Sequence, residues 1–492
     1  MPVFSRKPAH SAASPTGRAV WHGRSAVMRV TARTVLPLAA VGGLAALSLA
    51  VPAATVAAPA ARTAAHVASA RPIPDVTGPI LGAGQLPAPL TTSECQAEIG
   101  INCYTPLQYR VAYDLNSLYS GQATGRPITG AGETIVIVDS YGSPTIRNDL
   151  QTFDAEFGFP NPNLTIEQFG TIPPFDPTNA TMVGWAEETT LDVEYAHSIA
   201  PGANIVLAET PVAETEGVTG FPEMMNAEES LINQGVGDVI SQSFGATENT
   251  FPGFSSGNYS SLLDLRYAFK DAFAHHVTVL AAAGDTGATN YELDGQTLYP
   301  YRVNSWPSSD PLVTSVGGTM LDLNDAGNKL APDTVWNDGF GAGGGGYSAV
   351  FPRPLYQIGV AGVVGGHRGT PDISMSAAVN GGCWLYLSFG GVDGAGWYIF
   401  GGTSEATPIM AGIVALADQQ AGHRLGLINP ALYTLGALQQ VGIPGTGIVS
   451  VTSGNNTFGG VTGFNAAPGY NLAAGWGTID AAKFVPALAR LG

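Results

Sequence analysis

The chain has 492 residues, 45% of them hydrophobic, so it is long enough to bury a large core, and its 64 glycines and 35 prolines follow no fixed period, which indicates a globular fold with many tight turns. Charged residues make up 12%, with 38 acids against 20 bases, and six of those bases lie within the first 33 residues. This acidic balance argues against nucleic acid and anionic membrane surfaces as partners, and it is compatible with activity at low pH.

The N-terminal region has the layout of a secretory signal peptide. Residues 1–33 are basic and contain no acid, and residues 34–61 carry no charge. A membrane anchor is the alternative, but Pro37, Pro52 and the alanine-rich composition favour cleavage near residues 58–60. We therefore expect residues 1–60 to be a signal peptide and the protein to be secreted and extracellular, with no membrane attachment after cleavage.

Residues 61–103 are rich in Ala, Pro and Thr and show no clear periodicity, so we interpret them as a linker or a short pro-segment. In an exported protein, the short spacing of Cys95 and Cys103 favours a small disulfide loop. Cys383 is then left over. We interpret it as a buried thiol, because the sequence offers it no catalytic partner.

Short apolar runs recur further along the chain, and helical patterns separate them. The runs predict strands that are buried on both faces, at residues 134–138, 204–208, 238–241 and 277–282. Strands of this kind alternating with helices predict an α/β fold, with a parallel β-sheet flanked by helices. In such folds, functional groups gather at the carboxyl ends of the strands.

A predicted helix over residues 187–199 places Glu188 and Asp192 four residues apart on one face. The spacing alone favours a solvated acidic face, on which like charges repel mildly. If the face is buried, the two carboxyls would tend to share one proton and could act as an acid/base pair. His197 lies off this face, and we interpret it as structural.

Two polar residues near glycines, Asp285 and Ser404, each allow two interpretations. Asp285 follows a predicted buried strand; it is either a turn former or a neutral carboxyl that donates a hydrogen bond to a developing oxyanion. Ser404 follows Gly-Gly-Thr and precedes a helical run that reaches about residue 423. It is either an ordinary N-cap or a nucleophile near the positive end of a helix.

Three motifs taken together resemble those of the sedolisin family of serine-carboxyl peptidases: Glu188-x-x-x-Asp192, Ala283-Gly284-Asp285-Thr286-Gly287, and Gly402-Thr403-Ser404-x-x-x-Pro408. Supporting matches lie at residues 104–113, 241–245, 343–346 and 368–374. The resemblance covers residues 104–492, which we therefore expect to form a peptidase domain. It implies a subtilisin-like fold and endo- or tripeptidyl-peptidase activity at acidic pH. We expect an endopeptidase that acts on protein or peptide substrates. We expect a monomer.

The resemblance also implies a role for each matching residue. Ser404 would be the nucleophile, Glu188 the general base, and Asp192 the residue that orients Glu188. Asp285 would serve the oxyanion. Asp139 would extend the carboxyl network, and the stretch Ser243, Phe244 and Gly245 would bind the substrate backbone.

A subtilisin and a non-catalytic binding protein are the two alternatives to an acid peptidase. A subtilisin with a Ser/His/Asp triad lacks its base, since no His-Gly-Thr-His segment occurs, and Asp285 stands where subtilisins place Asn. A non-catalytic extracellular binding protein is the alternative function. It is suggested by the short segment before residue 104 and by Ser450 and Asn471, which replace the carboxylates of the family's calcium site. We expect no cofactor and no calcium.

Overall fold

The computed structural model describes residues 67–69, 86 and 88–492. The expected signal peptide, residues 1–60, lies outside these residues. Across the part of the chain that is described, no helix combines the length and apolar character needed to span a membrane.

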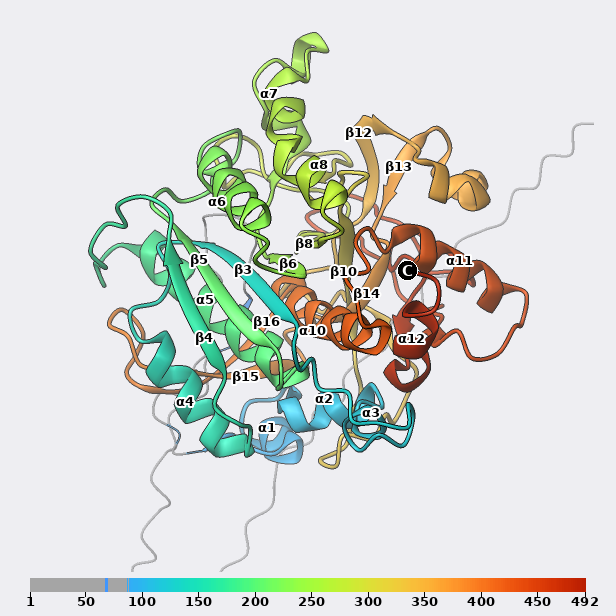
Figure 1. Cartoon of the computed structure of the whole chain (residues 1–492). Coiled ribbons are helices and arrows are strands. Elements are labelled where there is room, and N and C mark those ends of the chain that lie inside the picture. The colour runs from blue at the N-terminus through green and yellow to red at the C-terminus, as the bar shows by residue number, and fades with distance from the viewer. Residues whose placement is uncertain (1–66, 70–85, 87) are drawn as a thin grey trace, which may run out of the picture. The chain divides into compact units, whose positions relative to one another are not determined.

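The predicted α/β fold is confirmed by an eight-stranded central sheet (Figure 1). Its order is β11-β10-β8-β6-β3-β5-β4, with β14 also paired to β10. Every pairing is parallel except that of β10 with β11. The strands are β3 (Thr134–Ser140), β4 (Asn163–Gln168), β5 (Asn204–Thr210), β6 (Val239–Gln242), β8 (Thr278–Ala282), β10 (Thr314–Met320), β11 (Thr334–Val335) and β14 (Ile373–Ser376). All four predicted strands are in this sheet.

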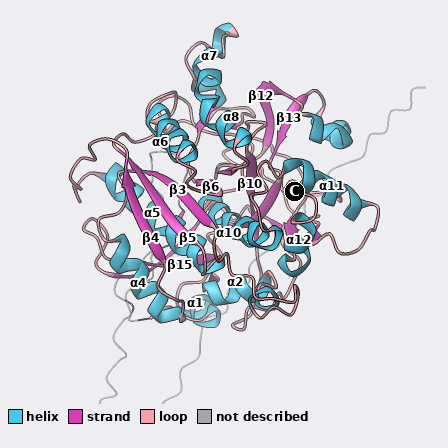
Figure 2. Ribbon diagram, viewed as in Figure 1, coloured by secondary structure: helices cyan, strands magenta, loops and turns pink. Residues whose placement is uncertain are grey.

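Alternating residues of the central strands enter two separate cores. Ile135 and Ile137 of β3 pack with helices α5 (Ala180–Ile199) and α10 (Thr403–Ala421), whereas Val136 and Val138 pack with α6 (Phe221–Asn233) and α8 (Tyr267–Ala274). Helices therefore cover both faces of the sheet (Figure 2). Each such aliphatic side chain is fully buried, which stabilises the fold by roughly 1.5–3 kcal/mol per residue.

Helix α5 begins seven residues before the predicted start at residue 187. The Asn179 side chain accepts hydrogen bonds from the N–H groups of Thr181 and Met182 and so caps the helix. Almost the whole helix is buried, so it has no amphipathic stripe by which its first turns could be recognised. It packs against α10, where Gly412 allows close approach: a Cβ at that position would lie 2.7 Å from Ile199 Cβ.

The remaining strands form smaller sheets. A second sheet has the order β1-β16-β15-β2, and three two-stranded ladders pair β12 with β13, β7 with β9, and β17 with β18. These strands are β1 (Val67–Ser69), β2 (Cys103–Tyr104), β7 (Ala246–Thr247), β9 (Ser305–Trp306), β12 (Gly346–Pro352), β13 (His367–Thr370), β15 (Gly382–Leu387), β16 (Gly396–Gly401), β17 (Ile448–Val449) and β18 (Thr478–Ile479). The other α-helices are α1 (Thr92–Glu98), α2 (Pro106–Ala112), α3 (Asn116–Tyr119), α4 (Ile146–Phe157), α7 (Ser260–Leu263), α9 (Ala361–Val364), α11 (Asn429–Gln440) and α12 (Ala481–Leu488).

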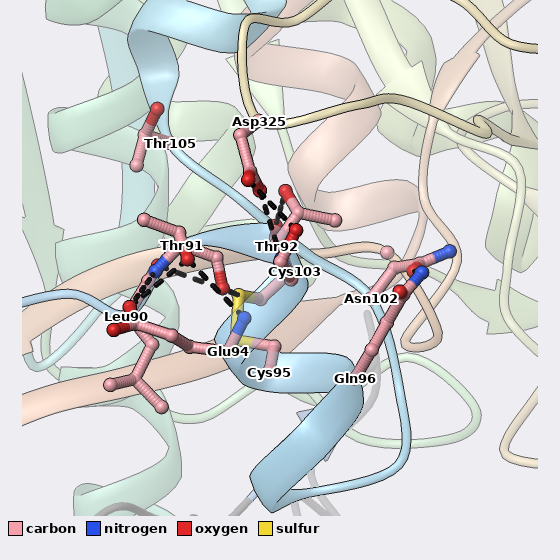
Figure 3. Close-up of a disulfide and its surroundings, with 12 residues drawn as sticks. Leu90, Thr91, Thr92, Glu94, Cys95, Gln96, Asn102, Cys103, Thr105 and Asp325 are labelled. Atoms are coloured by element: carbon pink, nitrogen blue, oxygen red, sulfur yellow. Dashed lines mark hydrogen bonds between the residues drawn. A yellow bond between two sulfur atoms is a disulfide. The ribbon is translucent and has the colours of Figure 1, made fainter.

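Cys95 and Cys103 form the expected disulfide, which ties α1 to β2 (Figure 3). Thr91 and Glu94 form a reciprocal capping box at the start of α1, and Ser93 binds Asp325 through both its N–H and its hydroxyl. The last part of the expected linker is thus ordered against the body of the protein. Its assignment as a linker or pro-segment stays a prediction. Cys383 is a buried free thiol, as expected.

The interior holds many carboxyl groups that have no cationic partner. Burial raises the pKa of five of them to about 8: Glu187, Glu216, Glu228, Glu405 and Asp418. The ion pairs formed among the described residues include none of these five. The folded protein therefore holds protons that the unfolded chain releases near pH 4.

We expect the protein to lose stability as the pH rises from about 5 to about 8. A carboxyl whose folded pKa is raised contributes stability that is fully present below its unfolded pKa and is lost as the pH rises through its folded pKa. Each such group can contribute a slope of about 1.4 kcal/mol per pH unit in this window. Thermal unfolding followed across pH 4–8 measures this. A melting temperature that stays level or rises with pH would contradict it.

Candidate active site

Ser404 is the second residue of α10 and is fully buried. The N-cap position belongs to Gly402, whose φ of 123° allows the turn out of β16, and no side chain caps the helix there. The interpretation of Ser404 as an ordinary N-cap is therefore wrong. Within the described part of the chain, its hydroxyl has no hydrogen-bond partner that meets normal geometry.

Glu188 and Asp192 are both buried on α5, so a solvated acidic face is excluded. Burial raises the pKa of Glu188 well above its usual range, and the nearby Asp192 carboxyl raises it further, whereas interaction with the Ser404 hydroxyl lowers it. This interaction identifies Glu188 as the titratable group that faces the serine. Two adjoining carboxyls in an apolar site hold protons together rather than ionise independently.

Asp192 is held by Ser243 and lies near a third carboxyl. The Ser243 hydroxyl donates a hydrogen bond of 2.7 Å to Asp192 Oδ1, which lowers the pKa of that carboxyl, whereas burial and Asp139 raise it. Asp139 itself is fully buried; burial raises its pKa to about 7, interaction with the Thr189 hydroxyl lowers it, and Glu209 raises it. The carboxyl network thus extends from Glu188 to the end of β3.

Asp285 connects the end of β8 with the turn that carries the serine. Its Oδ1 accepts hydrogen bonds from the Thr403 N–H at 2.8 Å and from the Thr403 hydroxyl at 2.9 Å. The Thr403 hydroxyl in turn accepts a hydrogen bond of 3.0 Å from the Gly284 N–H. Thr403 therefore holds the Asp285 carboxyl next to Ser404. Thr403 lies inside the Gly-Thr-Ser motif, but the motif alone predicts no role for it.

The stretch Ser243, Phe244 and Gly245 turns its side chains into the protein. Ser243 bonds Asp192 and lies 3.4 Å from the Ser404 carbonyl oxygen, whereas the Phe244 ring is fully buried and packs against Phe221. At Gly245, a Cβ would lie 3.0 Å from the Trp306 carbonyl oxygen. These contacts leave only the backbone of this stretch to bind a substrate, in the manner the resemblance implies.

His197 is structural, as predicted. Its Nε2 lies 2.8 Å from the Pro160 carbonyl oxygen and 3.3 Å from Asp154, and burial is the main reason that its pKa falls to about 4. By contrast, no sequence motif pointed to Glu405. This carboxyl follows Ser404 directly and is buried near the Tyr109 hydroxyl and the Cys383 thiol, both of which lower its pKa.

Known proteins are similar to this chain in sequence and in fold. A family model described as the subtilase family matches residues 179–431. Kumamolisin from Bacillus sp. (strain MN-32) is 31% identical over 400 residues, which cover 78% of this chain and 63% of kumamolisin. Sedolisin from Pseudomonas sp. (strain 101) is 30% identical over 392 residues, which cover 77% of this chain and 60% of sedolisin. The chain thus spans less than two thirds of the length of these relatives.

A solved structure of Pseudomonas sedolisin, described as a serine-carboxyl proteinase complexed with two molecules of pseudo-iodotyrostatin, is also similar. It superposes with a TM-score of 0.64 at 29% identity and covers 78% of this chain and 97% of that chain.

Proposed function

Because the chain belongs to the subtilase family, and within it to the sedolisins, we propose that it is a serine-carboxyl peptidase that hydrolyses peptide bonds of proteins at acidic pH. The observation that carries the proposal is the Ser404 hydroxyl, buried against the Glu188 carboxyl with Asp192 and Asp285 close by. His197, the histidine nearest these residues in the sequence, is turned towards Asp154 and is not available as a base.

In the proposed reaction, Glu188 accepts the proton of Ser404 as the serine oxygen forms a bond to the substrate carbonyl carbon. The same proton then passes to the leaving amine as the C–N bond breaks, and water later releases the acyl group by the reverse sequence. A raised pKa makes Glu188 a stronger base than an ordinary carboxylate. Asp192, held by Ser243, orients Glu188 and shares its proton.

Asp285 is proposed to donate a hydrogen bond to the oxyanion. A carboxylic acid can do so only while it is protonated, which acid pH favours. Its two hydrogen bonds from Thr403 fix the direction of the carboxyl before substrate arrives. The mechanism thus needs one carboxyl that accepts a proton and another that keeps one, and the different surroundings of Glu188 and Asp285 separate these two roles.

The alternative, a non-catalytic binding protein on the same scaffold, receives less support. Such a protein does not need three carboxyl groups buried around one serine, yet Glu188, Asp192 and Asp285 all lie near Ser404 in this chain. A secreted, monomeric enzyme is part of the proposal. The disulfide supports export, and the formal net charge of −18 argues against nucleic acid as a partner.

We also propose that the chain binds no calcium at the position where the family's carboxylates are replaced. Asn471 Nδ2 donates to the carbonyl oxygens of Val451 and Ala467, and its Oδ1 accepts from the N–H groups of Ala473 and Ala474. The amide thus uses carbonyls that a cation would need, and Ser450 is exposed. A hard cation finds too few charged oxygens here.

Ser404→Ala should abolish cleavage of a denatured protein at about pH 3–5, with a loss of at least about 10³-fold, because the nucleophile is removed. Release of soluble peptides measures this. The control Ser255→Ala changes an exposed serine and should behave as wild type. Equal cleavage by the Ser404→Ala protein would refute the assignment.

Thr403→Val should lower kcat by about tenfold or more with little change in KM, because the loss of the hydroxyl leaves the Asp285 carboxyl less well oriented for the transition state. Thr403→Ser keeps the hydroxyl and should retain most of the activity. Steady-state kinetics on one peptide measures both variants. A valine variant with wild-type kcat would show that Thr403 does not position Asp285.

Chelation by EDTA should leave the melting temperature at pH 5 unchanged, because the Asn471 amide already bonds the backbone carbonyls that a calcium ion would need. Added calcium should likewise have no effect, since a ligand that binds only the folded state would raise the melting temperature. A shift of several degrees in either experiment would show that calcium does bind.

A further inference from the structure

Three polar side chains lie side by side where the strands β3, β5 and β4 end. Asp139 is in register with Glu209, and Glu209 is in register with Gln168. Residues in register on parallel strands point to the same face of the sheet. This row therefore continues the catalytic carboxyl network across two further strands, away from Ser404.

A pocket of about 270 Å³ opens beside Glu209, between the turn after β3 and the segment that precedes α5. Its volume is below the roughly 300–1,000 Å³ typical of small-molecule sites, so it suits a single side chain. Aromatic and proline residues form much of its wall: Tyr141, Pro144, Pro173, Pro174 and Phe175. Glu209 and Gln168 supply its polar groups.

The turn that borders the pocket is held in an unusual conformation. Tyr141 has a φ of 63°, rare for a residue with a side chain, and its hydroxyl accepts a hydrogen bond from the Ala213 N–H. Gly142 follows, and a Cβ there would lie 2.0 Å from Glu209 Oε1, so glycine is needed for the carboxylate to lie against the turn. Backbone strain of this kind is typical of binding sites.

Glu209 has an amide partner and no cation. Gln168 Nε2 donates a hydrogen bond of 2.9 Å to Glu209 Oε2, and no ion pair among the described residues includes Glu209. Only 5% of the residue is exposed. Its remaining acceptor capacity lies next to aromatic and aliphatic walls. This combination fits a side chain with a long apolar stem and a cationic end.

We propose that this pocket is a substrate subsite that binds an arginine or lysine side chain of the polypeptide being cleaved, with Glu209 as its anionic partner. The inference rests on the proposed peptidase function and adds a specificity to it. Glu209 lies two strands from the β6 end that carries Ser243, or about 10 Å at the usual strand spacing. At about 3.3 Å per residue, the basic residue would stand two to four positions from the scissile bond.

The charged surroundings of Glu209 predict how this preference varies with pH. The Asp139 carboxyl lies beside it on β3, the Gln168 amide faces it from β4, and burial raises the pKa of Glu209. Glu209 is therefore increasingly protonated as the pH falls, and a neutral carboxyl holds a guanidinium weakly. The preference for a basic residue should be greater at pH 6 than at pH 4.

The test uses quenched-fluorescence peptides with one scissile bond, in which arginine is compared with citrulline at the second, third and fourth positions on each side. Citrulline has the same length but no charge. At one of these positions, the arginine peptide should have a kcat/KM about tenfold higher than that of the citrulline peptide at pH 6. The difference should be smaller at pH 4. Glu209→Gln should bring the ratio close to one, whereas Glu156→Gln, which alters an exposed glutamate of α4, should leave it unchanged.

A second variant keeps Glu209 and guards against misfolding. Ile172→Lys places a cation on the partly exposed wall of the pocket and should also lower the arginine preference. Equal cleavage of arginine and citrulline peptides at every position, or a preference that survives Glu209→Gln, would overturn the subsite. Failure of the wild-type protein to cleave any peptide would instead overturn the proposed function, and the subsite with it.

Discussion

The burial of α5 against α10 is the contact on which the site depends. It brings the Glu188 carboxyl, which is expensive to ionise away from water, against the hydroxyl of Ser404. Gly412 makes this approach possible, because a larger residue there would collide with Ile199. The same desolvation that makes these carboxyls costly in the ionised state raises the pKa of Glu188, and its proposed role as a base depends on that shift.

Many of the buried carboxyls that the structure describes are neutral groups and are not paired with cations. Buried ion pairs do occur, as between Arg368 and Asp372, but no ion pair among the described residues includes Glu228 or Glu405, and both lie near uncharged side chains. With only 20 basic residues for 38 acids, the composition leaves many acids without a counter-charge. Acidic surroundings remove this difficulty, because a protonated carboxyl is both a donor and an acceptor.

The sequence predicted four strands of the sheet and the candidate site residues because their signals are local. Four β-branched runs marked the strands, and three short motifs marked Ser404, Glu188, Asp192 and Asp285. What it missed depends on contacts between distant segments. The first turns of α5 are buried on all sides and show no stripe, Thr403 acts through a residue 118 positions away, and the pairing of Glu209 with Gln168 follows from strand register.

The N-terminal disulfide is linked to the catalytic turn through a sheet. Cys103 on β2 is in register with Gly382 on β15, and β15 pairs with β16, the strand that delivers the chain to Gly402 and Ser404. The pairing of β2 with β15 joins residues 279 positions apart, so it forms late, after the cost of closing a large loop has been met. A chain still being synthesised lacks α10 and therefore lacks Ser404, the proposed nucleophile. Such an order of assembly would protect the cell that makes the protein from its proposed activity.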